Sequence, residues 1–233
     1  MNCNKFLRSR LMLLLMGLVF AFALAGCGQE EAAKETAKPA AQAQETAAKP
    51  QGKTLVVYFS VPETTKPDNM NEEEENSTVV IDGRVLGNTQ YVAEVIREKT
   101  GAEIFRIEPE TPYPMNHAEL EKVATKEKQD KALPKISGKI ENLADYDTIF
   151  VGYPNWYADM PRIMYSFFED YDLSGKTVIL FVTSGGSGFS DSIRTIKKLE
   201  PNAKVMDKGL SVSRDKAQES KDDILSWLKG LGY

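Results

Sequence analysis

Short apolar runs alternate with helical patterns along most of the chain, and this alternation restricts the folds that the chain can adopt. Runs typical of strands cover residues 54–59, 104–107, 148–152, 177–183 and, more weakly, 204–210. Amphipathic stripes with helical spacing lie between these runs and after them, as in Tyr91, Val92, Val95 and Ile96. Alternating strands and helices build right-handed βαβ crossovers, so the sequence predicts an α/β domain with a parallel sheet and helices on both faces.

One loop downstream of the first run has the pattern of an anion site. Gly87, Asn88 and Thr89 open the helical pattern that contains Tyr91. A helix start offers unpaired N–H groups and the positive end of the helix dipole, and a glycine lets the backbone close on an anion. An ordinary turn followed by an N-cap is the alternative interpretation of this triplet.

Two further loops follow strand-like runs and favour the ligand interpretation. The third run leads into a loop with adjacent aromatic residues, which contains Pro154, Asn155, Trp156 and Tyr157. The fourth run leads into a flexible polar loop, which contains Thr183, Ser184, Gly185, Gly186, Ser187 and Gly188. Because the carboxyl ends of parallel strands line the ligand crevice of an open sheet, the three loops together predict a site for an aromatic ring system that carries a phosphate.

These motifs resemble those of the flavodoxin-like family, in particular a branch of bacterial flavodoxin-related proteins. The residues that carry the resemblance are the strand end Tyr58-Phe59-Ser60, the Gly152-Tyr153-Pro154-x-Trp156 loop and the loop from Thr183 to Gly188. The resemblance covers residues 53–233 and implies an open, doubly wound, five-stranded parallel sheet of order 2-1-3-4-5. It also implies flavin mononucleotide (FMN) as the cofactor and redox chemistry as the function.

The resemblance assigns a role to each of the strand-end loops. Ser60 and the Gly87-Asn88-Thr89 triplet would hold the phosphate of FMN. The loop from Pro154 to Tyr157 would flank the isoalloxazine ring, and the loop from Thr183 to Gly188 would contact its polar edge. This chain departs from the usual pattern because residues 61–86 separate Ser60 from Gly87, and because Leu86 stands where the family has a threonine.

The residues that separate the two halves of the phosphate motif form an insertion with its own signals. Asp82-Gly83 lies between apolar residues and predicts a β-hairpin. The acidic run of residues 72–75 is interpreted as a solvated turn rather than a metal or partner site. A second excursion, residues 109–134, contains a helix start at which Asn116 and Glu119 match a capping box.

The first 52 residues have the pattern of an export signal and a tether. Basic residues precede an apolar run, residues 11–24, which ends in Ala25-Gly26-Cys27 and is short for a membrane span. We therefore expect residues 1–26 to be a lipoprotein signal peptide and Cys27 to be lipidated on the extracytoplasmic face of the cell membrane. Residues 27–52 lack aromatic and branched apolar residues, as a disordered tether does, and lead to the domain of residues 53–233.

Several other classes of function match the sequence poorly. The net charge is −5, which disfavours nucleic acid as a partner. Gly185-Gly186-Ser187-Gly188-Phe189 resembles a hydrolase nucleophile elbow, but Phe189 replaces the final glycine and the only histidine, His117, lies upstream. No P-loop or dinucleotide motif is present, no metal site is indicated, and no catalytic residue can be assigned.

Two individual polar residues each keep two interpretations. His117 is either a surface imidazole or, as a minority hypothesis, a proton relay. Asp159 either lies near the flavin or caps the helix that starts after it.

The function is predicted to be that of a membrane-tethered FMN flavoprotein that carries electrons or reduces a small acceptor such as a quinone, with the donor and acceptor unidentified. The alternative is a binding module with a flavodoxin fold that has lost FMN and binds another ligand or a protein.

We expect the Cys27→Ser variant to leave the membrane, because it removes the residue that would be lipidated. Bacterial lipoproteins carry several acyl chains, and more than one chain is needed for firm anchoring. Fractionation of cells that express the wild type and the variant, with an antibody against the domain, checks this expectation. Variant protein that stays in the membrane with an uncut signal would indicate a spanning anchor instead.

Overall fold

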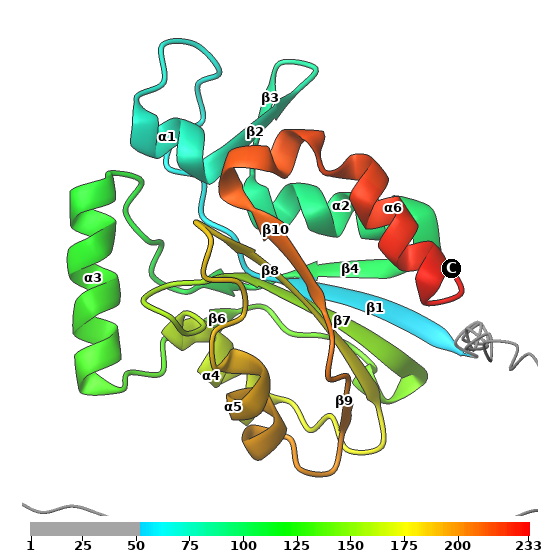
Figure 1. Cartoon of the computed structure of the whole chain (residues 1–233). Helices are drawn as coiled ribbons and strands as arrows, with labels where there is room; N and C mark the ends of the chain where they lie inside the picture. Colours follow the sequence, from blue (N-terminus) through cyan, green and yellow to red (C-terminus); the bar gives the residue numbers. More distant parts are fainter. Residues whose placement is uncertain (1–51) are drawn as a thin grey trace, which may run out of the picture. The chain divides into compact units, whose positions relative to one another are not determined.

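The computed structural model describes residues 52–233 (Figure 1). The predicted signal peptide, Cys27 and residues 28–51 of the tether lie outside the described residues. None of the helices in the described part of the chain is long and apolar enough to cross a membrane.

A parallel sheet forms the centre of the domain. Its main strands are β1 (Lys53–Tyr58), β4 (Glu103–Arg106), β7 (Tyr146–Pro154), β8 (Thr177–Ser184) and β10 (Leu210–Ser213). They are ordered β10-β8-β7-β1-β4, and every neighbouring pair is parallel. Numbered by their order along the chain, these strands have the order 2-1-3-4-5, so the predicted fold is confirmed.

The last strand differs from its prediction. Residues 204–210 were expected to form one strand, but only β9 (Lys204–Val205) and the start of β10 pair with β8. Residues 206–209 lie between the two pieces and belong to neither of them. At Gly209 a Cβ atom would lie 2.2 Å from the carbonyl oxygen of Leu180, so the backbone approaches β8 too closely there for any larger residue.

Helices cover both faces of the sheet, as the alternation of the sequence requires. Helices α2 (Asn88–Thr100) and α6 (Lys221–Gly230) pack on one face, and α4 (Arg162–Asp170) and α5 (Ser192–Leu199) pack on the other (Figure 1). Successive residues of β1 point to opposite faces, so Val56 joins the core under α2 while Leu55 and Val57 join the core under α4. The sheet is therefore buried on both sides.

The predicted insertion folds as a short helix followed by a hairpin. Helix α1 (Glu72–Ser77) leads into β2 (Thr78–Ile81) and β3 (Arg84–Gly87), which are antiparallel. Asp82 and Gly83 both have positive φ angles, as a two-residue hairpin turn demands, so the hairpin prediction is confirmed. The acidic run is not a turn, because Asn71 and Glu74 form a capping box that starts a helix there.

The second excursion carries a longer helix at the side of the sheet (Figure 1). Strand β5 (Glu108–Pro109) precedes helix α3 (His117–Asp130), and β6 (Ile136–Ser137) returns to pair with β5. The Asn116 side chain accepts a hydrogen bond from the backbone N–H of Glu119, so the predicted helix start is present with one half of its capping box. The remaining short helices are η1 (Leu143–Asp145) and η2 (Arg214–Glu219), and η2 follows β10 directly.

We expect Gly152→Ala to destabilise the domain by about 1–3 kcal/mol, because overpacking a rigid core has a cost of this size. A Cβ atom on Gly152 would lie 2.0 Å from ring carbons of Phe181, which is fully buried on the neighbouring strand β8. Gly230→Ala is the matched control, since a Cβ atom there meets nothing within 4 Å. Urea unfolding of both variants tests the prediction, which would be contradicted by equal stability.

Candidate functional site

The carboxyl ends of β1, β7 and β8 surround a cavity of about 380 Å³. We call it the first cavity. Its wall contains residues from all of the strand-end loops that the sequence singled out, namely Ser60, Asn88, Thr89, Pro154, Asn155, Trp156, Thr183, Ser184 and Gly185. This volume lies within the usual range for ligand pockets, roughly 300–1,000 Å³.

The two halves of the split anion motif meet at one end of this cavity. Ser60 and Gly87 are in contact although residues 61–86 separate them, and a Cβ atom on Gly87 would lie 2.1 Å from Ser60 Oγ. Only glycine therefore allows helix α2 to start this close to the end of β1. Gly87 occupies the N-cap position of α2 without a side-chain cap, so the first N–H groups of the helix remain available.

A hydrogen bond between two buried threonines joins the start of α2 to the sheet. Thr89 Oγ1 and Thr183 Oγ1 lie 2.7 Å apart, and both side chains are almost fully buried. The bond fixes the helix start against the end of β8, so that two of the loops are held in register. Either hydroxyl can be the donor of this bond, and the hydroxyl that accepts keeps its own hydrogen free to point toward the cavity.

Asn88 is also bound to the protein, but its amide is only half satisfied. Its Nδ2 donates to the carbonyl oxygen of Asn76 at 2.8 Å, which ties α2 to the end of α1. Its Oδ1 is buried and has no hydrogen-bond partner within the described residues. A buried acceptor without a partner is rare in folded proteins, and here it belongs to a residue of the cavity wall.

The aromatic loop after β7 presents one ring to the cavity. Trp156 packs edge to face against Phe59 and Tyr113, with ring centroids 5.5 and 5.6 Å away, so the indole is held on two sides. Asn155 Nδ2 donates to the carbonyl oxygen of Gly188 at 2.6 Å and thereby connects this loop to the loop after β8. The two loops consequently form a single wall.

Tyr157 lies apart from the rest of the predicted set. Its ring turns to α3, where its hydroxyl accepts a hydrogen bond from Thr125 Oγ1 at 3.0 Å, and it is absent from the wall of the first cavity. The reason is a tight turn in which Tyr157 and Ala158 both have positive φ angles. This turn sends the adjacent side chains in different directions, so Trp156 lines the first cavity and Tyr157 does not.

The glycine-rich loop contributes only its first part to the first cavity. Thr183, Ser184 and Gly185 line it, whereas Gly186, Ser187 and Gly188 do not. Ser184 Oγ accepts a hydrogen bond from the N–H of Gly188 at 2.9 Å, which closes the loop on itself. Positive φ angles at Gly186 and Gly188 permit this fold-back.

Several residues of the cavity wall, most of them charged or polar, were not predicted from the sequence to lie there. The insertion contributes Glu63, Glu72, Glu73, Asn76 and Ser77, α3 contributes His117 and Leu120, and η2 contributes Arg214. The hairpin signal at Asp82-Gly83 could have indicated that the insertion returns to the site. No local signal identifies Arg214, whose guanidinium would lie 3.1 Å from a Cβ atom on Gly185.

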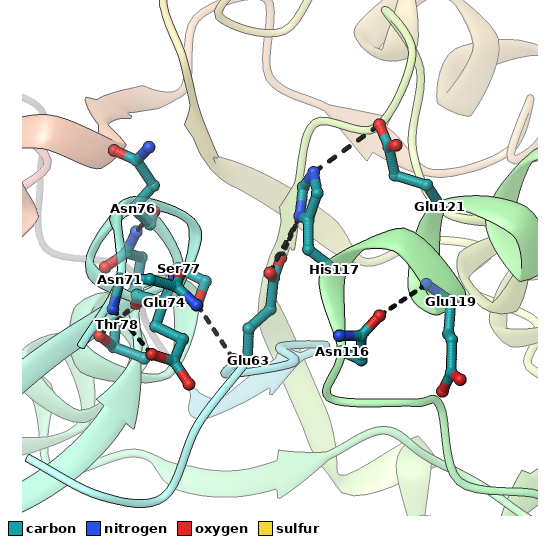
Figure 2. Close-up of polar contacts among 11 residues, drawn as sticks. Glu63, Asn71, Glu74, Asn76, Ser77, Thr78, Asn116, His117, Glu119 and Glu121 are labelled. Atoms are coloured by element: carbon teal, nitrogen blue, oxygen red, sulfur yellow. Dashed lines mark hydrogen bonds and ion pairs between the residues drawn. The ribbon is translucent and has the colours of Figure 1, made fainter. Parts of the chain in front are cut away.

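His117 ties the insertion to α3, as Figure 2 shows. Its Nδ1 lies 2.9 Å from Oε2 of Glu63, whose side chain is only 10% exposed, and its Nε2 lies 3.7 Å from Glu121. The backbone N–H of Glu63 donates to Ser77 Oγ at 3.0 Å, so Glu63 also holds the end of α1. The imidazole is therefore a structural link at the rim of the cavity rather than a free surface group.

Burial and hydrogen bonding shift the pKa values of this pair. The hydrogen bond with Glu63 raises the pKa of His117, against a smaller opposing effect of burial. Burial raises the pKa of Glu63, and the bond with His117 works against that rise. Asp159, for which two roles were open, does not cap the following helix, because α4 begins at Arg162 without a side-chain cap. Its carboxylate accepts hydrogen bonds from the Tyr165 hydroxyl and from the N–H of Met160, both at 2.8 Å. Within the described residues, no group of His, Cys, Asp and Glu has the arrangement of a metal site.

The comparisons with known proteins agree with this architecture. The flavodoxin family model matches residues 78–231. A protein from Bacteroides eggerthii that has been assigned as a flavoprotein is 28% identical, with a TM-score of 0.59 and coverage of 78% of this chain and 99% of its own. Another from Bacteroides uniformis is also 28% identical, with a TM-score of 0.56 and coverage of 76% and 98%.

A third structure, a flavoprotein from Lactobacillus acidophilus in complex with FMN, is 18% identical. Its TM-score is 0.50, and the match covers 73% of this chain and 97% of the other, so it shows a shared fold. No curated protein matches the sequence.

We expect His117→Gln to lower the free energy of unfolding at about pH 6 more than at about pH 9, because the raised pKa of His117 makes its stabilising charge a low-pH effect. The stabilisation is complete below the ordinary pKa of histidine and is lost as the pH rises through the raised value. Since the imidazole is 44% exposed, the effect should not exceed about 1 kcal/mol. Chemical denaturation at both pH values measures it.

Glu63→Gln provides the second arm of this experiment. It should remove most of the same pH dependence, because it takes away the partner that raises the pKa of His117. A difference between wild type and His117→Gln that stays constant across the pH range would contradict the assignment.

Proposed function

Because this chain belongs to the flavodoxin family, we propose that its domain binds FMN and that the protein is a membrane-tethered flavoprotein which carries electrons or reduces a small acceptor such as a quinone. One observation carries the proposal. The split anion motif, the Trp156 loop and the Thr183 loop meet in one cavity at the carboxyl edge of the sheet. The fold of the Lactobacillus acidophilus flavoprotein, determined in complex with FMN, gives further support.

The residues at the start of α2 are suited to an anion. Ser60 and Thr89 supply hydroxyl donors, the uncapped start of α2 supplies backbone N–H groups, and Gly87 provides the close approach that this cradle needs. Arg214 adds a positive charge to the same cavity. The unsatisfied Oδ1 of Asn88 is suited to a hydroxyl donor, such as a group on the ribityl chain.

The other loops are suited to a flat ring. Trp156 and Pro154 offer apolar surface that would orient the ring and exclude water from it. The loop of Thr183, Ser184 and Gly185 offers hydroxyl and backbone groups to a polar ring edge. When bound, FMN supplies the electron-transfer chemistry, and the protein sets its orientation and electrostatic environment.

The second candidate function is a binding module that no longer holds FMN, and a specific observation favours it. Glu63, Glu72 and Glu73 line the first cavity, and these carboxylates would repel a phosphate. The donor group of Asn88 is already bound to Asn76. Arg214 and the protonated form of His117 oppose this negative charge, so we place FMN first.

The membrane tether is a separate part of the proposal. It rests on the pattern that ends at Cys27 and on the composition of the residues that follow it. A lipid anchor would hold the domain near the extracytoplasmic surface of the membrane, where lipid-soluble acceptors such as quinones are concentrated. The fractionation experiment with Cys27→Ser tests this part independently of FMN.

We expect Thr89→Val to weaken FMN binding by roughly 1–3 kcal/mol while leaving riboflavin almost unaffected, because a charge-assisted hydrogen bond to the phosphate is lost. Titration of purified wild type and variant with both flavins, followed by flavin fluorescence, measures this. Failure of the wild type to bind FMN at all would favour the binding module.

Thr183→Val is the matched control for this experiment. It breaks the same hydrogen bond between Thr89 and Thr183 from the other side, yet it leaves the hydroxyl at the start of α2 in place. We expect Thr183→Val to affect FMN and riboflavin equally. Equal losses for both flavins in Thr89→Val would show that Thr89 supports the fold and that the phosphate is held elsewhere.

A further inference from the structure

A second cavity, of about 350 Å³, lies on α3 and the start of α4. It shares one residue with the first cavity, because Trp156 lines both of them. Tyr157, which the resemblance placed against the flavin, lines this second cavity instead. The role proposed for FMN in the first cavity leaves this space unexplained.

The partition between the two cavities is a strained turn. Trp156 and Asp159 pair through backbone hydrogen bonds of 2.9 and 3.1 Å, and the two residues between them, Tyr157 and Ala158, both adopt left-handed conformations. Residues with a Cβ atom enter this region at a cost, roughly 1–2 kcal/mol each. Strain that is retained in this way tends to mark functional positions, and here it directs Trp156 toward the first cavity and Tyr157 toward the second.

Positive charge gathers at the second cavity. Lys128, Lys131 and Arg162 line it, against two carboxylates, Glu127 and Asp159. Both carboxylates already accept hydrogen bonds from tyrosine hydroxyls at 2.8 Å. Arg162 is also committed, since it donates to the carbonyl oxygens of Lys131 and Ala132.

None of these three cations forms a salt bridge with any residue in the range 52–233. Lys131 differs from the other two, because its ammonium has no carbonyl partner within that range either. Lys128 donates to the carbonyl oxygen of Tyr157, and its ammonium lies 5.7 Å from the centroid of that ring. The cavity also receives the amino end of α4, at Pro161 and Arg162, where no side chain caps the helix. Two unpaired cations and a positive helix end together select for an anion.

The remainder of the wall is flat and apolar. Trp156, Tyr157 and Tyr165 contribute rings, and Met160 and Pro161 contribute aliphatic surface. A space of this size suits a ligand of one or two rings. We propose that the second cavity binds a small aromatic anion, such as an aromatic carboxylate or sulfonate, next to Trp156.

The charges of the two cavities distinguish their ligands. Glu63, Glu72 and Glu73 surround the first cavity, whereas the unpaired cations belong to the second. We therefore expect an aromatic anion that lacks the ribityl phosphate of FMN to bind on the α3 side of Trp156, whether or not the first cavity holds FMN. The proposal does not depend on FMN being bound, so its test can fail or succeed independently of the proposed function.

The test is calorimetric titration of the purified protein with naphthalene-2-sulfonate, compared with the neutral 2-naphthol. We expect saturable binding of the sulfonate that is about three- to fivefold tighter than that of 2-naphthol, because an exposed charge contact is worth up to about fivefold in affinity. The titration is repeated with FMN present in excess. Sulfonate affinity should stay the same, since the two ligands occupy different cavities.

Two variants and one control locate the site. Lys131→Gln should weaken sulfonate binding about three- to fivefold and leave 2-naphthol unchanged. Lys122→Gln removes the same charge from an exposed position of α3 outside the cavity and should leave both affinities unchanged. Ala124→Leu fills part of the cavity without a change of charge and should weaken both ligands.

Three results would overturn the proposal. The first is the absence of saturable sulfonate binding to the wild type. The second is displacement of the sulfonate by FMN, which would place it in the first cavity. The third is an equal effect of Lys131→Gln and Lys122→Gln, which would show that binding depends on general surface charge and not on this cavity.

Discussion

The parallel pairing of β7 with both of its neighbours is the constraint on which the rest of the domain depends. In this register Tyr58 of β1 lies beside Gly152, and Thr183 of β8 lies beside Pro154. Three strands therefore end at the same edge of the sheet, and their loops must converge there. Gly152 packs so closely on the Phe181 ring that the space between β7 and β8 has no room for a larger side chain there. Without this register, the loops that line the two cavities would not come together.

The insertion after β1 changes the character of the site without changing its position. Because the hairpin returns the chain to Gly87 beside Ser60, the anion motif is intact in space although it is split in sequence. The insertion also places the carboxylates of Glu63 and Glu72 in the wall of the first cavity. The long excursion thus preserves the donors of the site and adds negative charge around them. His117 stabilises this arrangement through Glu63.

The strained turn after β7 divides the carboxyl edge into two environments. The first cavity combines hydroxyl donors and helix N–H groups with an acidic rim, and the second combines aromatic rings with unpaired lysines. Among residues 52–233, Trp156 alone lines both cavities. In a flavoprotein, this arrangement would place the ring of the cofactor on one side of an indole and an aromatic anion on the other. The proposed function and the proposed second site are thus connected by one side chain.

The α/β class and the loops that form the first cavity could be predicted from local patterns in the sequence, whereas the strand order followed from the resemblance to a known family. Alternating periodicity dictates a parallel sheet, and the strand-end motifs mark its functional edge. Which side chains enter the cavity depends on how distant segments pack together in the folded domain. The direction of Tyr157 depends on a left-handed turn, and Arg214 and the glutamates arrive from segments that are distant in the chain. Contacts of this kind have no local signature, since the folded backbone alone sets the distances between them.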